Sequence, residues 1–425
     1  MENNPHINIP EHRSFALGDS ERDKILSERL NSNSYNPENP TPYLGVDWGN
    51  REHTEIVANY FVGAQWIEQK KSAIIVTPKI IGLDFFSMFV RCLENRDKDL
   101  QGRFSQIYSI DFGQPSIPVK ADTFQLTPLL VVHFLTLLES LTRRGLKSNF
   151  ISREEEMKAK VKGKVLIGRT LKKGVFVGRS DIISCRYQDY SVDCLENRIL
   201  KKALVFAQRY LASHKLQIRG VNLQSIADRC AASFTDISDS IAPQEIRQFR
   251  VNPLFKDYSD TIKVAKQLLQ RFDYSIDTTG KKDIDSSVPP FWINMPILFE
   301  LYVLGELRST YGSDIKYHLS TYGNELDFAR LSEKLIMDTK YIDEWSSEKA
   351  HGYIRQLAGY ARNVQIRKKM GLKKEDENAI LPCIILYPDE NGATKFSGEI
   401  LEMPDRIEQT EYLKFYRLGI KLPKI

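Results

Sequence analysis

The segment from residue 292 to residue 387 constrains the fold most, because its hydrophobic pattern changes period in a fixed order. A stretch with helical spacing precedes three short apolar runs, which a second helical stretch and a last apolar run follow. Helices repeat about every 3.6 residues and strands every two, so the spacing separates the two kinds of element. The predicted elements are a helix at 292–310, strands at 314–320, 325–331 and 334–342, a helix at 347–366 and a strand at 380–387. This order predicts an α+β fold.

Length and composition indicate a multidomain protein. The 425 residues suffice for two or three domains. A hydrophobic content of 42% and a charged content of 27% exclude wholesale disorder. We predict a mixed α/β region at 1–155, a largely helical connector at 156–285 and a C-terminal domain at 286–425. The net charge of +5 is mild, so any nucleic-acid surface has to be a local patch.

Cysteine usage and hydropathy predict a cytoplasmic protein. The five cysteines form no CxxC pair, which argues against a cysteine zinc site or a disulfide scaffold and favours a reducing compartment. The first residues lack the basic and apolar regions of a signal peptide. The most apolar run, at 129–138, is too short to span a bilayer.

Two of the predicted strands carry acidic residues in an apolar setting. Asp327 lies on the first of them, and Asp338 and Lys340 lie on the next. Side chains two residues apart on a strand share a face, so Asp338 and Lys340 point the same way. If the two strands form a hairpin, Asp327 can face Asp338 across the ladder. Two carboxylates and a lysine at one place are typical of a metal-dependent phosphodiesterase site, in which carboxylate oxygens hold Mg²⁺.

An acidic-x-Lys triplet alone is weak evidence, because this chain has others, such as Glu68 to Lys70. The context strengthens the interpretation. The triplet lies on an apolar strand, where a charged pair is costly unless it has a role. The helix that follows carries Gln356 and Tyr360 four residues apart, and therefore on one face.

These residues together resemble the PD-(D/E)xK nuclease superfamily, in its branch with a QxxxY helix. The residues that carry the resemblance are Asp327, Asp338-Thr339-Lys340, Gln356 and Tyr360, with Glu300 at the acidic position of the preceding helix. Leu326 stands where the motif name has proline. The resemblance implies a mixed sheet flanked by helices. It also implies that Asp327 and Asp338 bind Mg²⁺, which Mn²⁺ can replace, with the Thr339 carbonyl as a further candidate ligand. Lys340 would position the attacking water, and Gln356 and Tyr360 would orient the lysine or the DNA.

A wider resemblance covers about residues 160–390. The segments at 185–204, 289–303 and 335–342 are similar to the McrC family, the nuclease subunits of McrBC modification-dependent restriction systems. That similarity implies cleavage of double-stranded, modified DNA, together with a hexameric McrB-like AAA+ GTPase partner that the subunit stimulates. It also implies that region 1–155 binds the partner and that 286–425 is the nuclease domain.

The residues also allow two other functions. One is a nuclease of the same fold that acts alone in DNA repair, and the other is a non-catalytic adaptor that activates a GTPase ring. The chain itself is not expected to bind a nucleotide. Its nearest approach to a P-loop runs from Gly163 to Thr170, and Arg169 replaces the lysine of that motif. None of the seven histidines has the HxH or HxxxH spacing of a zinc hydrolase.

A basic cluster follows the Gln356 helix. Its members are Arg367, Lys368, Lys369, Lys373 and Lys374. Such a cluster can contact a DNA backbone near the scissile phosphate, although a solvated helix end is the simpler alternative. We predict DNA contact at this cluster.

Overall fold

The computed structural model describes most of the chain. The described residues are 6–26, 45–93, 101–104, 106–111, 114–115, 117–119, 126–213, 222–250, 258–278, 287–321, 324–342, 345, 347–376, 378–402 and 407–424. The chain divides into two compact units, one formed by Met1–Leu129 with Lys281–Ile425 and the other by Leu130–Gly280. Helices and mixed sheets occur together, so the predicted α+β multidomain class is confirmed. The functional division at residues 155 and 285 stays a prediction.

The N-terminal part of the first unit consists of two adjoining sheets. A five-stranded sheet has the order β1 (Ile7–Pro10), β6 (Ser72–Thr77), β5 (Phe61–Glu68), β13 (Phe291–Asn294) and β7 (Tyr108–Ile110). A three-stranded sheet has the order β2 (Ser14–Ala16), β4 (Glu55–Ala58) and β3 (Val46–Trp48). Ile9, Ile56, Ile74 and Trp292 are among the buried residues that pack together here. Short elements complete this part: α1 (Asp19–Leu26), α2 (Phe85–Leu93), α3 (Gln101–Phe104), and β8 (Ile117–Pro118) paired with β12 (Ser287–Val288).

The predicted helix at 292–310 begins later than expected. Its first residues form β13, which pairs with both β5 and β7, and the helix α10 then runs over Met295–Tyr311. Asn294 ends the strand and caps the helix, because its side chain accepts a hydrogen bond from the Ile297 amide. A continuous apolar run fits a buried strand and a buried helix equally well, so spacing alone could not place this boundary.

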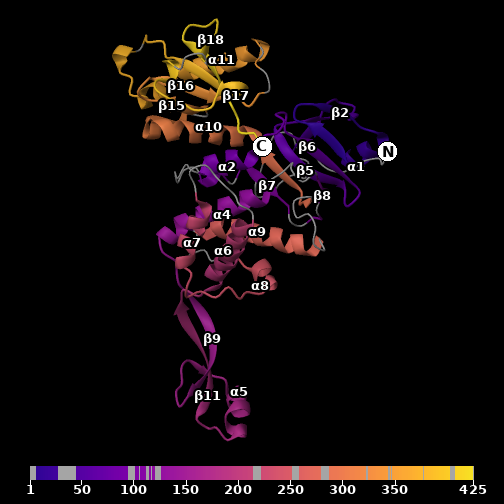
Figure 1. Cartoon of the computed structure of the whole chain (residues 1–425), viewed down its shortest axis with the longest axis vertical. Helices are drawn as coiled ribbons and strands as arrows, with labels where there is room; N and C mark the ends of the chain where they lie inside the picture. The colour runs from indigo at the N-terminus through magenta and orange to yellow at the C-terminus, as the bar shows by residue number, and fades with distance from the viewer. Residues whose placement is uncertain are drawn as a thin grey trace. The chain divides into compact units, whose positions relative to one another are not determined.

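The C-terminal part of the first unit is built on a six-stranded mixed sheet. Its order is β14 (Ile315–Thr321), β15 (Asn324–Arg330), β16 (Leu335–Thr339), β17 (Cys383–Ala393), β19 (Phe415–Ile420) and β18 (Ile407–Gln409). β14, β15 and β16 are antiparallel neighbours, whereas β17 is parallel to β16 and to β19. The strands predicted around 314–342 are therefore confirmed. Figure 1 shows this sheet between α10 and α11.

Two helices follow β16 in the chain and pack on the sheet. The structure divides the predicted helix at 347–366 into α11 (Ser347–Arg362) and α12 (Val364–Lys369). Asn363 causes the break, since its side chain accepts hydrogen bonds from the amides of Gln365 and Ile366 and so caps α12. Apolar residues of both helices pack on the sheet, including Leu357, Ile366, Ile336 and Ile385.

The second unit is mainly helical. It contains the larger part of α4 (Leu126–Arg143), together with α6 (Leu195–Ser213), α7 (Leu223–Ala232), α8 (Pro243–Gln248) and α9 (Ser259–Thr278). The spacing of apolar residues predicts helices at about 127–145, 196–211, 221–233 and 257–273, and the structure confirms them within a few residues. Among the described residues, no helix is both long enough and apolar enough to cross a membrane.

A long β-hairpin projects from these helices (Figure 1). The run of charged residues at 151–174 predicts a solvated linker with a strand at 165–167, and the structure corrects both. β9 (Asn149–Lys158) pairs along its whole length with β11 (Ile182–Ser191), and β10 (Lys164–Val165) ends before α5 (Ile167–Lys173) begins. Charged residues pair across the hairpin surface, so a strand with a run of like charges is stable here: Glu154 with Arg169 and Arg186, and Glu156 with Lys173.

Candidate active site

The two predicted aspartates lie next to each other on β15 and β16. The antiparallel register pairs Phe328 with Met337, and one further step sets Asp327 opposite Asp338. Asp338 is 1% exposed, and Asp327 is partly buried. The structure therefore brings together two carboxylates that the sequence placed eleven residues apart.

Thr339 holds the carboxylate of Asp327. Its backbone amide donates to Asp327 Oδ2 at 2.8 Å, and its hydroxyl donates to the same oxygen at 2.6 Å. Two donors on one oxygen fix the direction of the carboxylate and leave its second oxygen for another ligand. The predicted role of Thr339 was its carbonyl as a metal ligand. In the structure its amide and hydroxyl contact Asp327, and the carbonyl as a metal ligand stays a prediction.

Lys340 pairs with Asp338. Its Nζ lies 2.5 Å from Asp338 Oδ2, which shows that the two side chains share a face, as the spacing predicted. The same ammonium lies 5.5 Å from the centre of the Tyr353 ring, on α11. The sequence did not predict Tyr353 as a site residue. Its position about one helical turn before Gln356 was all that could have indicated it.

Glu300 on α10 belongs to the same site. Its Oε1 accepts a hydrogen bond from the Tyr317 hydroxyl at 2.7 Å and lies 2.7 Å from His318 Nε2. Arg103, which precedes His318 by 215 residues in the chain, lies 3.7 Å from this oxygen and 2.9 Å from His318 Nε2. The acidic helical position is thus supported by three residues that the motif does not include.

His318 has an unusual backbone conformation. Its φ is 52°, in the left-handed region, although it lies within the strand β14. A residue other than glycine in this region carries strain of about 1–3 kcal/mol, and such strain tends to occur at functional sites. The spacing of the histidines in the sequence did not predict His318 as a site residue, because the residues that it contacts lie on other elements.

Three ligand atoms gather beside the aspartate pair. Glu300, His318 and Asp327 each offer one, and all three atoms lie within 4.8 Å of one another. Carboxylate oxygens suit hard cations such as Mg²⁺ and Mn²⁺, and an imidazole nitrogen suits transition metals better. This donor set is compatible with a divalent metal ion.

Burial and repulsion shift the pKa of both aspartates. Burial raises the pKa of Asp327 well above its usual range, and the negative charges of Asp338 and Glu300 add to this shift. Burial also raises the pKa of Asp338, against the opposing effect of the Lys340 ammonium. For Glu300, burial opposes ionisation, but hydrogen bonds from His318 and Tyr317 and the charge of Arg103 hold its pKa below the usual range.

The two residues of the QxxxY pair, Gln356 and Tyr360, form a hydrogen bond with each other within α11. Gln356 Nε2 donates to the Tyr360 hydroxyl at 3.0 Å, and Tyr360 packs into the core between the helices and the sheet. Gln356 is exposed. Their predicted contact with Lys340 or DNA stays a prediction.

The members of the basic cluster have different surroundings. Arg367 donates to the carbonyls of Ala361, Asp376 and Ala379, so its guanidinium ties α12 to the loop that follows. Lys368 and Lys369 are exposed on α12, and Lys368 and Lys373 line a pocket of about 930 Å³. The side chain of Lys374 lies outside the described part of the structure. DNA contact by the five residues stays a prediction.

Comparisons with known proteins give one family. A family model described as "McrBC 5-methylcytosine restriction system component" matches residues 58–372. No curated protein matches the chain.

Two solved structures are similar over much of the chain. One is a half-complex of Thermococcus gammatolerans McrB AAA+ hexamers with bound McrC, with 15% identity and a TM-score of 0.38 over 98% of this chain and 94% of that chain. The other is the Thermococcus gammatolerans McrBC complex, with 16% identity and a TM-score of 0.33 over 71% and 87% of the two chains. Because the family model covers well over half of the sequence, the chain belongs to the family of McrBC 5-methylcytosine restriction system components.

Proposed function

We propose that this chain is the DNA-cleaving subunit of its restriction system, a Mg²⁺-dependent endonuclease of the PD-(D/E)xK type. The observation that carries the proposal is the group formed by Asp327, Asp338 and Lys340, with Glu300 beside it. An adaptor without catalytic activity would not need to bury these charges together, because each buried charge costs free energy of folding unless it is compensated.

The residues fit a divalent metal ion. Asp327 has one oxygen fixed by Thr339 and is close enough to Asp338 and Glu300 to be repelled by them. A cation between the carboxylates would remove this repulsion. Asp327 and Glu300, which lie together with His318, would hold it, and Asp338 opposite Asp327 would be a further ligand. A bound Mg²⁺ supplies Lewis-acid polarisation of the phosphoryl oxygen and lowers the pKa of a bound water.

The side chains of this chain then have separate tasks. Thr339 keeps the Asp327 carboxylate in one orientation through its two hydrogen bonds. Lys340, held by Asp338, presents an ammonium that donates a hydrogen bond to the attacking water and stabilises negative charge on the phosphate. Burial by itself would lower the pKa of Lys340, but the charge of Asp338 and its hydrogen bond with the ammonium raise that pKa above the usual range. The lysine therefore stays protonated at neutral pH.

The proposal includes an AAA+ GTPase partner. The family description names a component of a system, and the relative from Thermococcus gammatolerans is an McrC bound to McrB AAA+ hexamers. This chain has an exposed apolar surface that suits a protein partner. We define the arm tip as five exposed apolar residues beside the β9–β11 hairpin, two on α5 and three in the short 3-10 helix that follows it: Ile167, Leu171, Val175, Phe176 and Val177. Apolar side chains gathered in this way are typical of interaction sites.

The test is cleavage of plasmid DNA that carries 5-methylcytosine by the chain and its GTPase partner, with Lys340→Met as the variant. Loss of the ammonium should lower the single-turnover rate by several orders of magnitude, because its charge stabilisation is lost. Lys334→Met is the matched control, since the Lys334 ammonium donates to the Met370 carbonyl. Wild-type cleavage by folded Lys340→Met would refute the assignment, and cleavage by the chain without a partner would favour a stand-alone nuclease.

A further inference from the structure

Tyr341 follows the candidate catalytic lysine directly and is held by the N-terminal sheet. Its hydroxyl donates to Glu11 Oε2 at 3.1 Å. Its carbonyl accepts a hydrogen bond from Lys79 Nζ at 2.9 Å, and the same ammonium lies 3.9 Å from the centre of its ring. Tyr341 is 4% exposed and Glu11 is 2% exposed, so both groups are removed from water.

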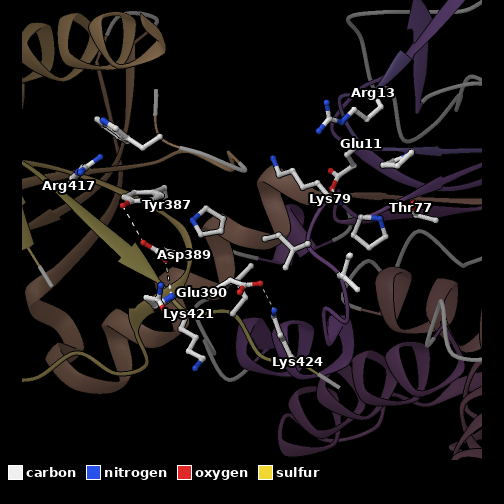
Figure 2. A pocket seen from close by; sticks show the side chains of 18 of the residues that line it. Glu11, Arg13, Thr77, Lys79, Tyr387, Asp389, Glu390, Arg417, Lys421 and Lys424 are labelled. Carbon is white, nitrogen blue, oxygen red and sulfur yellow. Dashed lines mark hydrogen bonds and ion pairs between the residues drawn. The ribbon is translucent and has the colours of Figure 1, made fainter. Parts of the chain in front are cut away.

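The two residues that hold Tyr341 are themselves fixed to one edge of the five-stranded sheet. Glu11 follows β1 and Lys79 follows β6, and these strands are parallel neighbours. The Glu11 amide donates to the Thr77 carbonyl at 2.9 Å, and the Lys79 amide donates to Glu11 Oε2 at 3.0 Å. One carboxylate oxygen of Glu11 therefore accepts from both Lys79 and Tyr341. Figure 2 shows Glu11 and Lys79 together on one wall of a pocket of about 1120 Å³.

Tyr341 connects this edge with two residues of the site. Lys340 is its neighbour in the chain, and the Lys340 amide donates to the Leu386 carbonyl on β17 at 2.9 Å. On its other side, the Tyr341 ring lies 5.9 Å from the ring of Phe299, which precedes Glu300 on α10. A shift of Tyr341 would therefore displace both Lys340 and the Glu300 turn of the helix.

We infer that Glu11 and Lys79 are positioning residues for DNA cleavage, which act through Tyr341 on Lys340. This inference rests on the proposed nuclease function and deepens it, because it makes the N-terminal sheet a structural part of the nuclease site. A buried carboxylate such as that of Glu11 keeps the geometry in which it accepts its hydrogen bonds, since every alternative leaves a buried charge without these donors. A displacement of about 1 Å at a catalytic group can cost about 100-fold in rate.

The experiment uses the full chain reconstituted with its AAA+ GTPase partner and plasmid DNA that carries 5-methylcytosine. The variants are Tyr341→Phe, Glu11→Gln and Lys79→Met, and kcat and KM for DNA are measured separately. Each variant should lower kcat by about 10- to 100-fold with little change in KM, because the lysine is misplaced while DNA contacts remain. Lys79→Arg keeps a cation and hydrogen-bond donors, and should recover most of the lost rate.

Two controls separate positioning from general damage. Tyr311→Phe removes a hydroxyl at the end of α10, and Lys71→Met removes a lysine whose ammonium pairs with Glu68 on the same sheet. Both should cleave at the wild-type rate. Stimulation of the partner's GTPase should also be unchanged in the Tyr341, Glu11 and Lys79 variants.

Three outcomes would overturn the inference. Folded variants with wild-type kcat would show that Lys340 does not depend on Tyr341. Equal losses of cleavage and of GTPase stimulation, or loss without recovery in Lys79→Arg, would show a merely structural role. An inactive wild-type complex would instead overturn the nuclease proposal itself, together with the inference that rests on it.

Discussion

The hydroxyl and the amide of Thr339 both donate to the same oxygen of Asp327, at 2.6 and 2.8 Å. This contact joins β15 and β16 where the ladder carries the two aspartates. Thr339→Val keeps the shape of the side chain and removes one of the two donors. We expect cleavage to fall about 10- to 100-fold, because the carboxylate loses its fixed direction, and stability to fall by about 1 kcal/mol. Thr339→Ser restores a hydroxyl and should cleave at close to the wild-type rate. Measured cleavage rates and urea unfolding check both effects.

Asp327 should destabilise the protein when no metal is bound. Its pKa is raised in the folded state, so stability is greatest below the pKa of the unfolded chain and falls as pH rises toward the folded pKa. Asp327→Asn removes this ionisation. In EDTA, the variant should melt at a higher temperature than the wild type at pH 8, with a smaller difference at pH 5. It should cleave no DNA.

Asp314 is a control residue whose pKa is shifted in the direction opposite to that of Asp327. Burial tends to raise its pKa, but hydrogen bonds from Ser332 and Arg330 hold it below the usual range. Its stabilisation is present above the unfolded pKa and is lost as pH falls through the folded pKa. Asp314→Asn should therefore lower the melting temperature at pH 8. A lower melting temperature for both variants would contradict the repulsion at Asp327.

Cleavage should require Mg²⁺ or Mn²⁺. Excess EDTA should abolish it, and Ca²⁺ should raise the melting temperature without supporting cleavage, because its larger size and looser geometry do not suit the reaction. The rise in melting temperature should be absent in Asp327→Asn. Activity that persists in EDTA would contradict a carboxylate metal site.

We expect the arm tip to bind the GTPase partner and to take no part in DNA cleavage. Phe176 and Val177 are 75% and 67% exposed. Replacing both with aspartate should reduce stimulation of the partner's GTPase at least tenfold, because the apolar contact would then bury two charges. Leu413→Asp is the matched control, since Leu413 is 69% exposed in the other unit, outside the region 1–155 that is predicted to bind the partner, and should leave stimulation unchanged. Equal stimulation by the double variant and the wild type would refute the role of the arm tip.

The basic cluster should divide into two roles. Lys368→Ala with Lys369→Ala should weaken DNA binding and reduce its dependence on salt concentration, with little change in stability. Arg367→Ala should lower the free energy of unfolding by about 1–3 kcal/mol, because it leaves the carbonyls of Ala361, Asp376 and Ala379 without this donor. Filter binding at several salt concentrations and urea unfolding distinguish the two roles. An unchanged salt dependence in the double lysine variant would remove DNA contact from this cluster.

Local pattern was sufficient to predict much of the C-terminal part of the first unit. The strands around Asp327 and Asp338 were predicted from alternation and from the polar turn between them, and their antiparallel pairing follows from the short connection. The shared face of Asp338 and Lys340 is a property of any strand, so the sequence was enough to predict it. The sequence did not predict the boundary between β13 and α10 at Asn294, because a continuous apolar run is equally typical of a buried strand and of a buried helix.

The sequence by itself determined the order and approximate bounds of most strands and helices around the site, because those follow from local periodicity. Only the tertiary structure decided which distant groups meet them. Arg103 reaches His318 across 215 residues, and Glu11 reaches Tyr341 across 330. His318 points at Glu300 from a strand position with a φ of 52°, a conformation that no residue pattern in this chain indicates. Such contacts depend on how sheets and helices pack, and packing is set by the sum of many burial and hydrogen-bond terms across the whole unit and not by any local spacing.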